Sequence, residues 1–501
     1  MLLMLLFAVS GVEAKLACSD LTALKLPNAR INSAVEVPAS DSLPAHCWIN
    51  GIIEKEINFE LNLPADWNEK LYMGGNGGFA GSYRNWGTDD ALVRGYAVTQ
   101  TDTGHIGGPI DASWALDNMR RKLNFGFRAV HLTAKTAKYI VKAYYRKKIS
   151  YSYFMGCSRG GGQAMIESQR YPGDFDGIIA GAPAYNWTGF GMGMVWNQQR
   201  MYPEPQDLYH PTVPNSKLPI LDAAVLNLCD GIDGLEDGLI DDPRNCPFDP
   251  EIHLPICPGN EDSSDCFTTE QIDAIQAVYD GPSNSRGQIF PGYPPGAESS
   301  FFGWDFWVTD GRVWLKALYG IDDIPNAQYG FGQEIMRYLV YNDPDYDIRE
   351  FDFETDLRDT ALAAAILNGT SSNLTRFKKR GGKMIMYNGW TDHAITPLGT
   401  IQYYEQVLER MGGPRKVNNF LRLFMVPGMM HCSMGPGPNE VDWLTALELW
   451  VEEDIAPDRI VALQPQTGRT RPLCPYPQVA RYQDRGSIDD AQNFECVEPD
   501  R

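Results

Sequence analysis

Short apolar runs alternate with segments of helical periodicity in the first and last thirds of the chain. Six apolar runs predict strands, at residues 71–73, 96–101, 151–155, 177–180, 383–387 and 421–426. Helices are predicted from periodicity or from their place after a strand, at residues 127–145, 163–169 and 442–451. Strands that alternate with helices are typical of a mostly parallel α/β sheet.

The middle of the chain interrupts this pattern. Residues 186–359 are rich in Pro, Gly, Asp and aromatic residues, and their hydrophobic periodicity is poor. The α/β pattern returns with the strand predicted at residues 383–387. We therefore expect one α/β catalytic domain, formed by residues 15–185 and 360–501, which an inserted lid domain at residues 186–359 divides.

The first fourteen residues, MLLMLLFAVSGVEA, form a short apolar run followed by small residues. This pattern predicts a signal peptide cleaved after Ala14, and therefore a secreted, extracellular protein. Because no Lys or Arg precedes the run, a buried N-terminal helix is the alternative. A membrane span needs about 20 apolar residues. No run reaches that length, so we expect no membrane anchor.

Charge and cysteine content agree with secretion. The 501 residues include 43 Lys and Arg against 64 Asp and Glu, a formal net charge of −21. That charge argues against nucleic acid or an anionic membrane as a partner. Ten cysteines without any C-x-x-C spacing argue against zinc and predict five disulfides in an oxidising compartment.

The disulfide connectivity stays open, because ten cysteines allow about 10³ pairings. Closeness along the chain favours four pairs, Cys18–Cys47, Cys229–Cys246, Cys257–Cys266 and Cys474–Cys496. Cys157 and Cys432 then remain to pair with each other.

Three N-x-[ST] sequons also fit a secreted protein. They begin at Asn186, Asn368 and Asn373, and the last two lie within one eight-residue stretch. We predict N-glycosylation at these asparagines, with the closely spaced pair in a surface loop.

A G-x-S-x-G motif lies at residues 156–160, between a predicted strand and a predicted helix. This is the context of a nucleophile elbow, a strained turn that presents a serine at the end of a strand. The flanking glycines avoid clashes in that turn, and the helix that follows points the positive end of its dipole at the serine. Ser158 is the candidate nucleophile; the alternative is a chance glycine-rich turn.

A serine nucleophile needs a base and a carboxylate that orients the base. In this fold class the acid and then the histidine follow the serine along the chain. Asp392 lies just after the strand predicted at 383–387, and His431 lies just after the strand at 421–426. We therefore predict a catalytic triad of Ser158, Asp392 and His431. His393 is the rival base, but it adjoins Asp392 and is expected to point elsewhere.

An oxyanion hole needs two backbone N–H donors. One donor is expected from Arg159, the residue after the nucleophile. The other is expected from the glycine-rich loop at residues 74–78, where a missing side chain lets the backbone approach the substrate. Gly77 and Gly78 are both candidates for this second donor.

The cysteines next to the triad complete a recognisable arrangement. Cys157 precedes Ser158 and Cys432 follows His431, so a disulfide between them would fasten the nucleophile turn to the histidine loop. This Cys-Ser, Asp, His-Cys order resembles the fungal tannase and feruloyl esterase family. The resemblance covers nearly the whole mature chain and includes LPAHC at residues 43–47, GNGGFAG at 75–81 and PGMMHC at 427–432.

The resemblance implies an α/β-hydrolase core with a large lid, hydrolysis of aromatic carboxylic esters and the Cys157–Cys432 disulfide. It also supports the four local cysteine pairs. The elbow departs from the Cys-Ser-Thr-Gly-Gly-Arg often found in fungal members, because residues 157–162 read Cys-Ser-Arg-Gly-Gly-Gly. A backbone donor after the serine is retained, but the charge near the pocket differs and leaves the exact substrate open.

An acidic loop, CDGIDGLEDGLIDDPRNC at residues 229–246, is a candidate calcium site. It lacks the EF-hand pattern, yet Asp230, Asp233 and Asp237 could converge on one hard cation. The family resemblance implies these three ligands together with the carbonyls of Leu235 and Leu239. A solvated acidic loop is the alternative. We expect Ca²⁺ to be structural, because acyl transfer by a serine needs no metal.

An aromatic cluster at residues 301–307, together with Trp314, is either lid core or a wall for a phenolic ring. The expected activity is hydrolysis of hydroxycinnamoyl (feruloyl) esters of plant cell-wall polysaccharide by acyl transfer. Tannase activity on galloyl esters, hydrolysis of another aromatic ester and a serine peptidase are the alternatives. A catalytically inactive binding protein is disfavoured, because a candidate for each triad member is present. The oligomeric state stays open.

Overall fold

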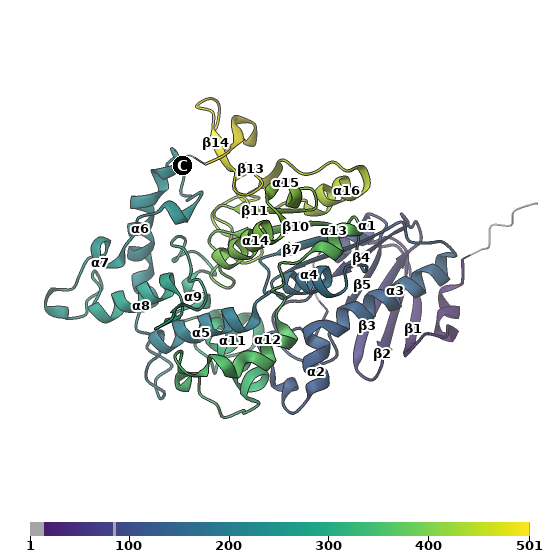
Figure 1. Ribbon diagram of the computed structural model, residues 1–501, viewed down its shortest axis with the longest axis horizontal. Coiled ribbons are helices and arrows are strands. Elements are labelled where there is room, and N and C mark those ends of the chain that lie inside the picture. Colours follow the sequence, from purple (N-terminus) through teal and green to yellow (C-terminus); the bar gives the residue numbers. More distant parts are fainter. Residues whose placement is uncertain (1–14, 84–86, 500–501) are drawn as a thin grey trace, which may run out of the picture.

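The computed structural model describes residues 15–83 and 87–499, so the predicted signal peptide lies outside the described residues. A nine-stranded sheet forms its centre (Figure 1). Its strands are Ala29–Val37 (β1), His46–Ile53 (β2), Ile57–Pro64 (β3), Lys70–Gly74 (β4), Ala97–Thr101 (β5), Tyr151–Cys157 (β6), Gly177–Gly181 (β7), Lys383–Gly389 (β10) and Leu421–Val426 (β11). They are ordered β1-β2-β3-β5-β4-β6-β7-β10-β11 across the sheet.

Six of these strands run parallel to one another, and they are the six that the apolar runs predict. Parallel pairing joins β5, β4, β6, β7, β10 and β11 in that order. Strands β1–β3 pair antiparallel with one another, and β3 pairs antiparallel with β5. The apolar runs do not predict β1–β3. In β3, buried residues alternate with partly exposed ones, which is usual for an antiparallel strand with one covered face.

Helices cover both faces of the parallel strands. The helices α3 (Ala129–Tyr145), α4 (Arg159–Arg170) and α14 (Pro397–Met411) pack on one face. The helices α1 (Thr88–Val93) and α16 (Trp443–Glu453) pack on the other. Met384 and Met386 of β10 face the first layer, whereas Ile385 and Tyr387 face the second. Burial on both sides explains why these strands read as continuous apolar runs.

A large insertion separates two strands that are neighbours in the sheet. Strand β7 ends at Gly181, and its partner β10 begins at Lys383. Between them lie the helices α5 (Trp187–Met201), α6 (Leu218–Cys229), α7 (Pro250–His253), α8 (Thr269–Asp280), α9 (Trp304–Trp307), α10 (Arg312–Tyr319), α11 (Ala327–Glu334), α12 (Ala361–Leu367) and α13 (Thr375–Lys379), and the short strands β8 (Ser283–Asn284) and β9 (Gly287–Gln288). Figure 1 shows most of these helices gathered on the side away from β1–β3.

The remaining elements lie around this frame. They are the helices α2 (Met119–Leu123) and α15 (Pro414–Val417) and the strands β12 (Ile460–Leu463), β13 (Thr470–Leu473), β14 (Val479–Tyr482) and β15 (Phe494–Val497). The structure joins the ten cysteines as Cys18–Cys47, Cys157–Cys432, Cys229–Cys246, Cys257–Cys266 and Cys474–Cys496. Among the helices of the described ranges, none has the length and apolar character of a membrane span.

Candidate active site

The candidate nucleophile lies where β6 ends and α4 begins. Ser158 has φ 62° and ψ −121°, a backbone region that residues other than glycine rarely adopt. The N–H of Ser158 donates to the carbonyl of Gly181 at 3.0 Å, and its carbonyl accepts from the N–H groups of Gly162 at 3.0 Å and Ala184 at 2.9 Å. The surroundings therefore maintain a strained strand-to-helix turn, which is the geometry of a nucleophile elbow.

Asp392 and His431 meet although they belong to different loops. Asp392 follows β10, and His431 follows the adjacent parallel strand β11. His431 Nδ1 lies 2.9 Å from Asp392 Oδ2 and 3.1 Å from Oδ1. Asp392 is 1% exposed, and its Oδ1 also accepts the N–H groups of Ala394 and Ile395 at 2.9 Å. The carboxylate therefore has a defined position, and it leaves His431 Nε2 available to a nucleophile.

Ser158 and His431 line one pocket. Their side chains form no hydrogen bond with each other, and both belong to the described residues. Such bonds are often long without substrate and shorten in the complex. The disulfide between Cys157 and Cys432, whose Cα atoms are 5.8 Å apart, joins the residues next to them. The nucleophile turn and the histidine loop are thus covalently linked.

His393 is placed where it cannot compete as the base. It is buried between the rings of Tyr293 and Trp304, with ring centroids 6.5 and 6.4 Å away. Neither ring nitrogen has a hydrogen-bond partner among the described residues. Burial lowers the pKa of His393 to about 4. An imidazole without access to the pocket and with so low a pKa is a poor general base.

The geometry distinguishes the two glycines considered for the oxyanion hole. Gly78 lines the same pocket as Ser158 and Arg159, whereas Gly77 does not. Within the described ranges, the N–H groups of Gly78 and Arg159 donate to no acceptor. Gly78 has φ 53°, and a Cβ atom there would lie 2.2 Å from the carbonyl oxygen of Pro109. Only glycine fits this backbone path, and it leaves a free donor beside the nucleophile.

Two buried amides that the sequence analysis does not single out hold the glycine-rich loop against α4. Asn76 N–H donates to Gln163 Oε1 at 3.0 Å, and Gln163 Nε2 donates to Asn76 Oδ1 at 2.8 Å. Asn76 Nδ2 also donates to the carbonyl of Thr101 at 2.8 Å. Two features of the sequence could have indicated this pair. Asn76 is a polar residue among four glycines, and Gln163 is a polar residue in the helix that follows the candidate nucleophile.

We expect Gln163→Leu to lower kcat about 10- to 100-fold with little change in KM, because a displaced oxyanion donor loses its transition-state contact. Steady-state kinetics on one ester measure this split. Gln169→Leu is the matched control on the same helix, since Gln169 donates to the carbonyl of Gly369 and not to the loop. An equal effect of both substitutions would show that the amide pair is only structural.

The pocket around these groups is mainly apolar and aromatic. Its cavity volume is about 30 Å³, and it is lined by Gly78, Ser158, Arg159, Ala184, Trp187, Phe190, Met194, Trp307, Phe331, Ala394, Ile395 and His431. Trp307 packs edge-on to His431, with the ring centroids 5.4 Å apart. Of the aromatic cluster considered above, Trp307 reaches the pocket, whereas Phe301, Phe302 and Trp314 pack against one another.

Sequence and structure comparisons decide the family. The model of the tannase and feruloyl esterase family matches residues 46–497. This chain belongs to the tannase and feruloyl esterase family. An uncharacterized esterase of Xanthomonas campestris is 36% identical over 98% of this chain and 93% of that protein. Mono(2-hydroxyethyl) terephthalate hydrolase of Piscinibacter sakaiensis is 33% identical over 93% of this chain and 87% of that protein.

The fold agrees with that assignment. The crystal structure of feruloyl esterase B from Aspergillus oryzae matches with a TM-score of 0.83 and 26% identity, over 96% of this chain and 99% of that chain. The predicted α/β-hydrolase fold is therefore confirmed, and the chain is a carboxylic ester hydrolase of the tannase and feruloyl esterase family.

The elbow of this family member has a local reason to differ after the nucleophile. The elbow sequence expected from the family resemblance has Arg at the position of Gly162. Here a Cβ atom at Gly162 would lie 2.1 Å from the carbonyl oxygen of Ala184. The loop after β7 thus leaves no room for a side chain at 162, and the arginine of this elbow is Arg159 instead.

The acidic loop connects the insertion to the C-terminal strands. Asp230 Oδ1 accepts the N–H groups of Asp237 and Gly238 at 3.2 and 2.9 Å, and Asp233 Oδ1 accepts that of Leu235 at 2.9 Å. Asp237 Oδ2 pairs with the guanidinium of Arg471, which is buried next to it.

Carboxylates are crowded in this loop. Burial and neighbouring aspartates raise the pKa of Asp233 to about 6 and that of Asp241 to about 8. In the described part of the chain, Asp230, Asp233 and Asp237 do not form a group with ligand oxygens within 4.8 Å of one another. The donor set consists of oxygen atoms only, as a hard cation requires.

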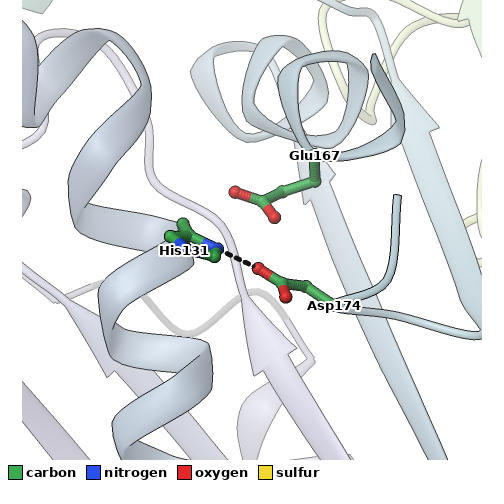
Figure 2. A group of neighbouring side chains, drawn as sticks. All are labelled: His131, Glu167 and Asp174. Carbon is green, nitrogen blue, oxygen red and sulfur yellow. Dashed lines mark hydrogen bonds and ion pairs between the residues drawn. The ribbon is translucent and has the colours of Figure 1, made fainter. Parts of the chain in front are cut away.

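A second cluster lies between α3 and α4 on the sheet face. Figure 2 shows His131 of α3, Glu167 of α4 and Asp174 of the following loop directed toward one another. Their ligand atoms lie within 4.8 Å of one another, close enough for one metal ion. His131 Nδ1 pairs with Asp174 Oδ2, and Lys138 donates to the carbonyl of Asp174. The set mixes nitrogen with oxygen donors and is therefore unlike the calcium site expected from the sequence.

Glu167 is the least favourably placed carboxyl group of this cluster. It is 1% exposed, and its two oxygens accept no hydrogen bond from the described residues. Burial and the charge of Asp174 raise the pKa of Glu167 well above its usual value. The folded protein therefore retains a proton that the unfolded chain releases near its ordinary pKa, so this group lowers stability as pH rises between those two values.

We expect Glu167→Gln to increase the free energy of unfolding by about 1–3 kcal/mol at pH 8, because a neutral amide avoids the cost of burying an unpaired carboxylate. The gain should shrink toward pH 4, where the carboxyl is protonated in both states. Denaturant unfolding at both pH values measures the difference. A loss of stability at pH 8 would show that the negative charge is needed there, for example by a bound cation.

The sequons differ in their surroundings. Asn368 Nδ2 donates to Asn186 Oδ1 and to Thr188 Oγ1, each at 2.9 Å, and both asparagines are partly buried. Asn373 is exposed, and its Oδ1 accepts the N–H of Thr375. Two of the three predicted acceptor amides therefore face each other rather than solvent.

Proposed function

We propose that this protein hydrolyses aromatic carboxylic esters by a Ser158–His431–Asp392 acyl-transfer mechanism. The observation that carries the proposal is the buried Asp392–His431 pair, which lies on the same pocket as the strained Ser158. The disulfide beside both residues supports this assignment, because it limits their relative movement. The lid insertion, residues 186–359 in our proposed division, supplies the aromatic wall of the pocket.

In the first step, Ser158 Oγ attacks the ester carbonyl while His431 Nε2 accepts its proton. Asp392 orients the imidazole and stabilises its positive charge. The N–H groups of Arg159 and Gly78 hold the oxyanion. His431 then protonates the departing alcohol, and the same groups assist water in releasing the acid from the acyl-enzyme.

The aromatic pocket supports an aromatic acyl group as the substrate feature. Trp187, Phe190, Trp307 and Phe331 offer flat apolar surface close to the nucleophile. The related feruloyl esterase B and terephthalate monoester hydrolase are named for aromatic esters. We favour feruloyl esters of plant cell-wall polysaccharide, with galloyl esters as the second candidate. A peptidase activity is disfavoured because the relatives compared above are esterases.

Hydrolysis of methyl ferulate against methyl gallate tests this proposal. Purified protein should hydrolyse at least one of them, and Ser158→Ala should hydrolyse neither. Preference for ferulate indicates hydroxycinnamate esters, whereas preference for gallate indicates tannins. No hydrolysis of any aromatic ester by correctly folded protein would overturn the proposed function.

We propose that the acidic loop binds Ca²⁺ through Asp230, Asp233 and Asp237, with the carbonyls of Leu235 and Leu239. The all-oxygen donor set and the number of aspartates gathered in this loop support a cation there. The ion would brace the lid against the C-terminal strands, to which Asp237 is already tied through Arg471. It takes no part in the acyl-transfer steps.

Removal of calcium with EGTA should lower Tm, since an ion held at about 100 times its Kd stabilises the fold by about 2.7 kcal/mol. A variant with Asp230→Asn and Asp233→Asn should melt at the lower temperature with or without EGTA. Glu167→Gln, in the other cluster, should respond to EGTA like the wild type. Calcium-free purified protein with an unchanged Tm would contradict the site.

We also propose secretion after cleavage behind Ala14, with a glycan at Asn373. The exposed side chain of Asn373 supports this choice among the three sequons. Expression in a eukaryotic secretory host, followed by intact mass and endoglycosidase treatment, tests both points. An uncleaved N-terminus or an unmodified Asn373 would contradict them.

A further inference from the structure

The cluster of His131, Glu167 and Asp174 brings three segments of the chain together (Figure 2). His131 comes from α3, Glu167 from α4, and Asp174 from the loop between α4 and β7. None of the three lines the pocket that contains Ser158 and His431. Helix α4 begins immediately after Ser158. The cluster is therefore separate from the candidate active site, but it shares a helix with the candidate nucleophile.

Glu167 is the member of the cluster that points to a bound ligand. Its side chain is 1% exposed and is directed toward the other two, and neither of its oxygens accepts a hydrogen bond from the described residues. The neighbouring ammonium of Lys138 donates to the carbonyl of Asp174 and to Ser152 Oγ, and not to Glu167. Buried carboxylates in proteins are normally paired or coordinate a metal. The protein itself thus leaves Glu167 without a donor or a cation.

The spacing and type of the ligand atoms suit a first-row divalent metal ion. The ligand atoms of His131, Glu167 and Asp174 all lie within 4.8 Å of one another. Zn²⁺ bound at about 2.0–2.2 Å from each ligand would hold those atoms about 3.3–3.6 Å apart. Small side-chain movements therefore suffice to bind it. One imidazole nitrogen with two carboxylates favours Zn²⁺ over Ca²⁺, which takes oxygen ligands.

The surroundings of His131 provide both orientation and access. Its ring stacks on that of Tyr171, with the centroids 3.9 Å apart and 11° between the planes. This contact limits rotation of the imidazole, as outer contacts of metal ligands commonly do. The side chains of His131 and Asp174 remain 21% and 14% exposed. An ion can therefore enter from solvent, whereas Glu167 closes the inner end of the site.

We propose that His131, Glu167 and Asp174 form a Zn²⁺ site that fastens α4 to α3 and to the loop before β7. The ion supplies the positive charge that Glu167 lacks, and water completes its coordination. The site differs from the proposed calcium loop in its place and in its nitrogen ligand. Because none of its ligands lines the pocket, the ion stabilises the fold and takes no part in acyl transfer.

Titration of the wild-type protein with ZnCl₂ tests the site. The protein is first stripped with EDTA and reloaded with CaCl₂ alone; in this calcium-only form the wild type and Glu167→Gln should respond alike to EGTA. Isothermal titration calorimetry should then detect a Zn²⁺ ion bound at this cluster. At about 100 times its Kd, zinc should raise Tm by about 2–4 °C. No binding and no change in Tm would overturn the proposal, and would favour a proton shared between Glu167 and Asp174.

Glu167→Gln gives a prediction in which the effect depends on the metal. Without zinc, the variant should melt above the wild type, because a neutral amide is less costly to bury than a carboxylate. Zinc should raise the Tm of the wild type and leave that of the variant unchanged, so the difference between them should shrink or reverse. The variant is expected to fold, so its loss of zinc binding would not reflect unfolding. An equal rise of Tm in both proteins would overturn the proposal.

His131→Asn removes the nitrogen ligand and should weaken zinc binding at least about 10-fold. His210→Asn is the matched control, because His210 Nδ1 contacts Asp207 Oδ2 at 2.8 Å in an exposed pair with no third ligand among the described residues. It should bind zinc like the wild type. Binding that survives in both His131→Asn and Glu167→Gln, as it would at the candidate catalytic histidine, would overturn the site. None of these measurements requires ester hydrolysis, so their outcome is independent of the proposed function.

Discussion

Ser158→Ala is expected to lower kcat for aromatic ester hydrolysis by about 10⁴- to 10⁶-fold, the range found when a triad nucleophile is removed. The residual rate would come from the oxyanion donors and the pocket, which the substitution leaves in place. The strained backbone of Ser158 is held by two backbone hydrogen bonds that do not involve its side chain: its N–H donates to the carbonyl of Gly181, and its carbonyl accepts from the N–H of Ala184. Folding should therefore be retained, and single-turnover kinetics with circular dichroism measure both properties.

Ser168→Ala is the matched control for this prediction. Ser168 lies on α4, is also buried, and its hydroxyl donates to the carbonyl of Met165 at 2.8 Å. It should keep kcat within about threefold, because it does not line the pocket. Turnover by Ser158→Ala at more than about one hundredth of the wild-type rate would mean that the nucleophile lies elsewhere.

The second large effect concerns the Cys157–Cys432 disulfide. The bond closes a loop with a sequence separation of 275. Replacing both cysteines with serine should lower the free energy of unfolding by about 3–5 kcal/mol, because long loops gain the most from closure. It should also lower kcat, since the neighbours Ser158 and His431 lose their covalent link and a misplacement of about 1 Å can cost 10²-fold in rate.

The Cys474–Cys496 disulfide offers a control of the same chemistry away from the pocket. Its loop has a sequence separation of 22, and neither cysteine lines the pocket. The corresponding double serine variant should lose stability, by about 3 kcal/mol in the loop-closure model, and keep kcat. Denaturant unfolding and kcat measured below the transition separate the two effects. A Cys157→Ser/Cys432→Ser variant with full kcat would refute a role for the bond in positioning the catalytic pair.

Ser158 and the neighbouring disulfide contribute to the candidate active site in different ways. In the proposed mechanism the side chain of Ser158 is the nucleophile, whereas the disulfide holds two loops that are 275 positions apart in sequence. The amide pair of Asn76 and Gln163 adds a third constraint by fixing the glycine-rich loop to α4. Each constraint is present before substrate binds, so the entropy cost of ordering the site arises during folding and not during catalysis.

The sequence predicts the parallel core and the order of the triad because both depend on local patterns. Strands β6, β7, β10 and β11 are buried on two faces and therefore read as apolar runs. The ends of parallel strands meet at one edge of a sheet. Asp392 and His431 could thus be placed near Ser158 from their positions after such strands alone. The cysteines beside Ser158 and His431 are local signals in the same way.

Apolar runs in the sequence do not predict the antiparallel strands β1–β3 or the C-terminal hairpins. Their faces are only half covered, so polar residues such as Asn58 and Glu60 interrupt the apolar pattern in β3. Local patterns also fail to predict the aromatic wall of the pocket, for another reason. Trp187, Phe190 and Phe331 come from separate helices of the insertion, and no spacing within any one of them shows that they share a pocket.

By itself, then, the sequence determined which residues could perform acyl transfer and in which kind of fold, because strand burial and the elbow motif are properties of short segments. Only the tertiary structure placed Gly78 and not Gly77 on the pocket, paired Asn186 with Asn368, and left Arg159 buried without an ion pair among the described residues. Each of these outcomes depends on contacts between segments far apart in the chain. Long-range packing sets such contacts, and no local pattern encodes them.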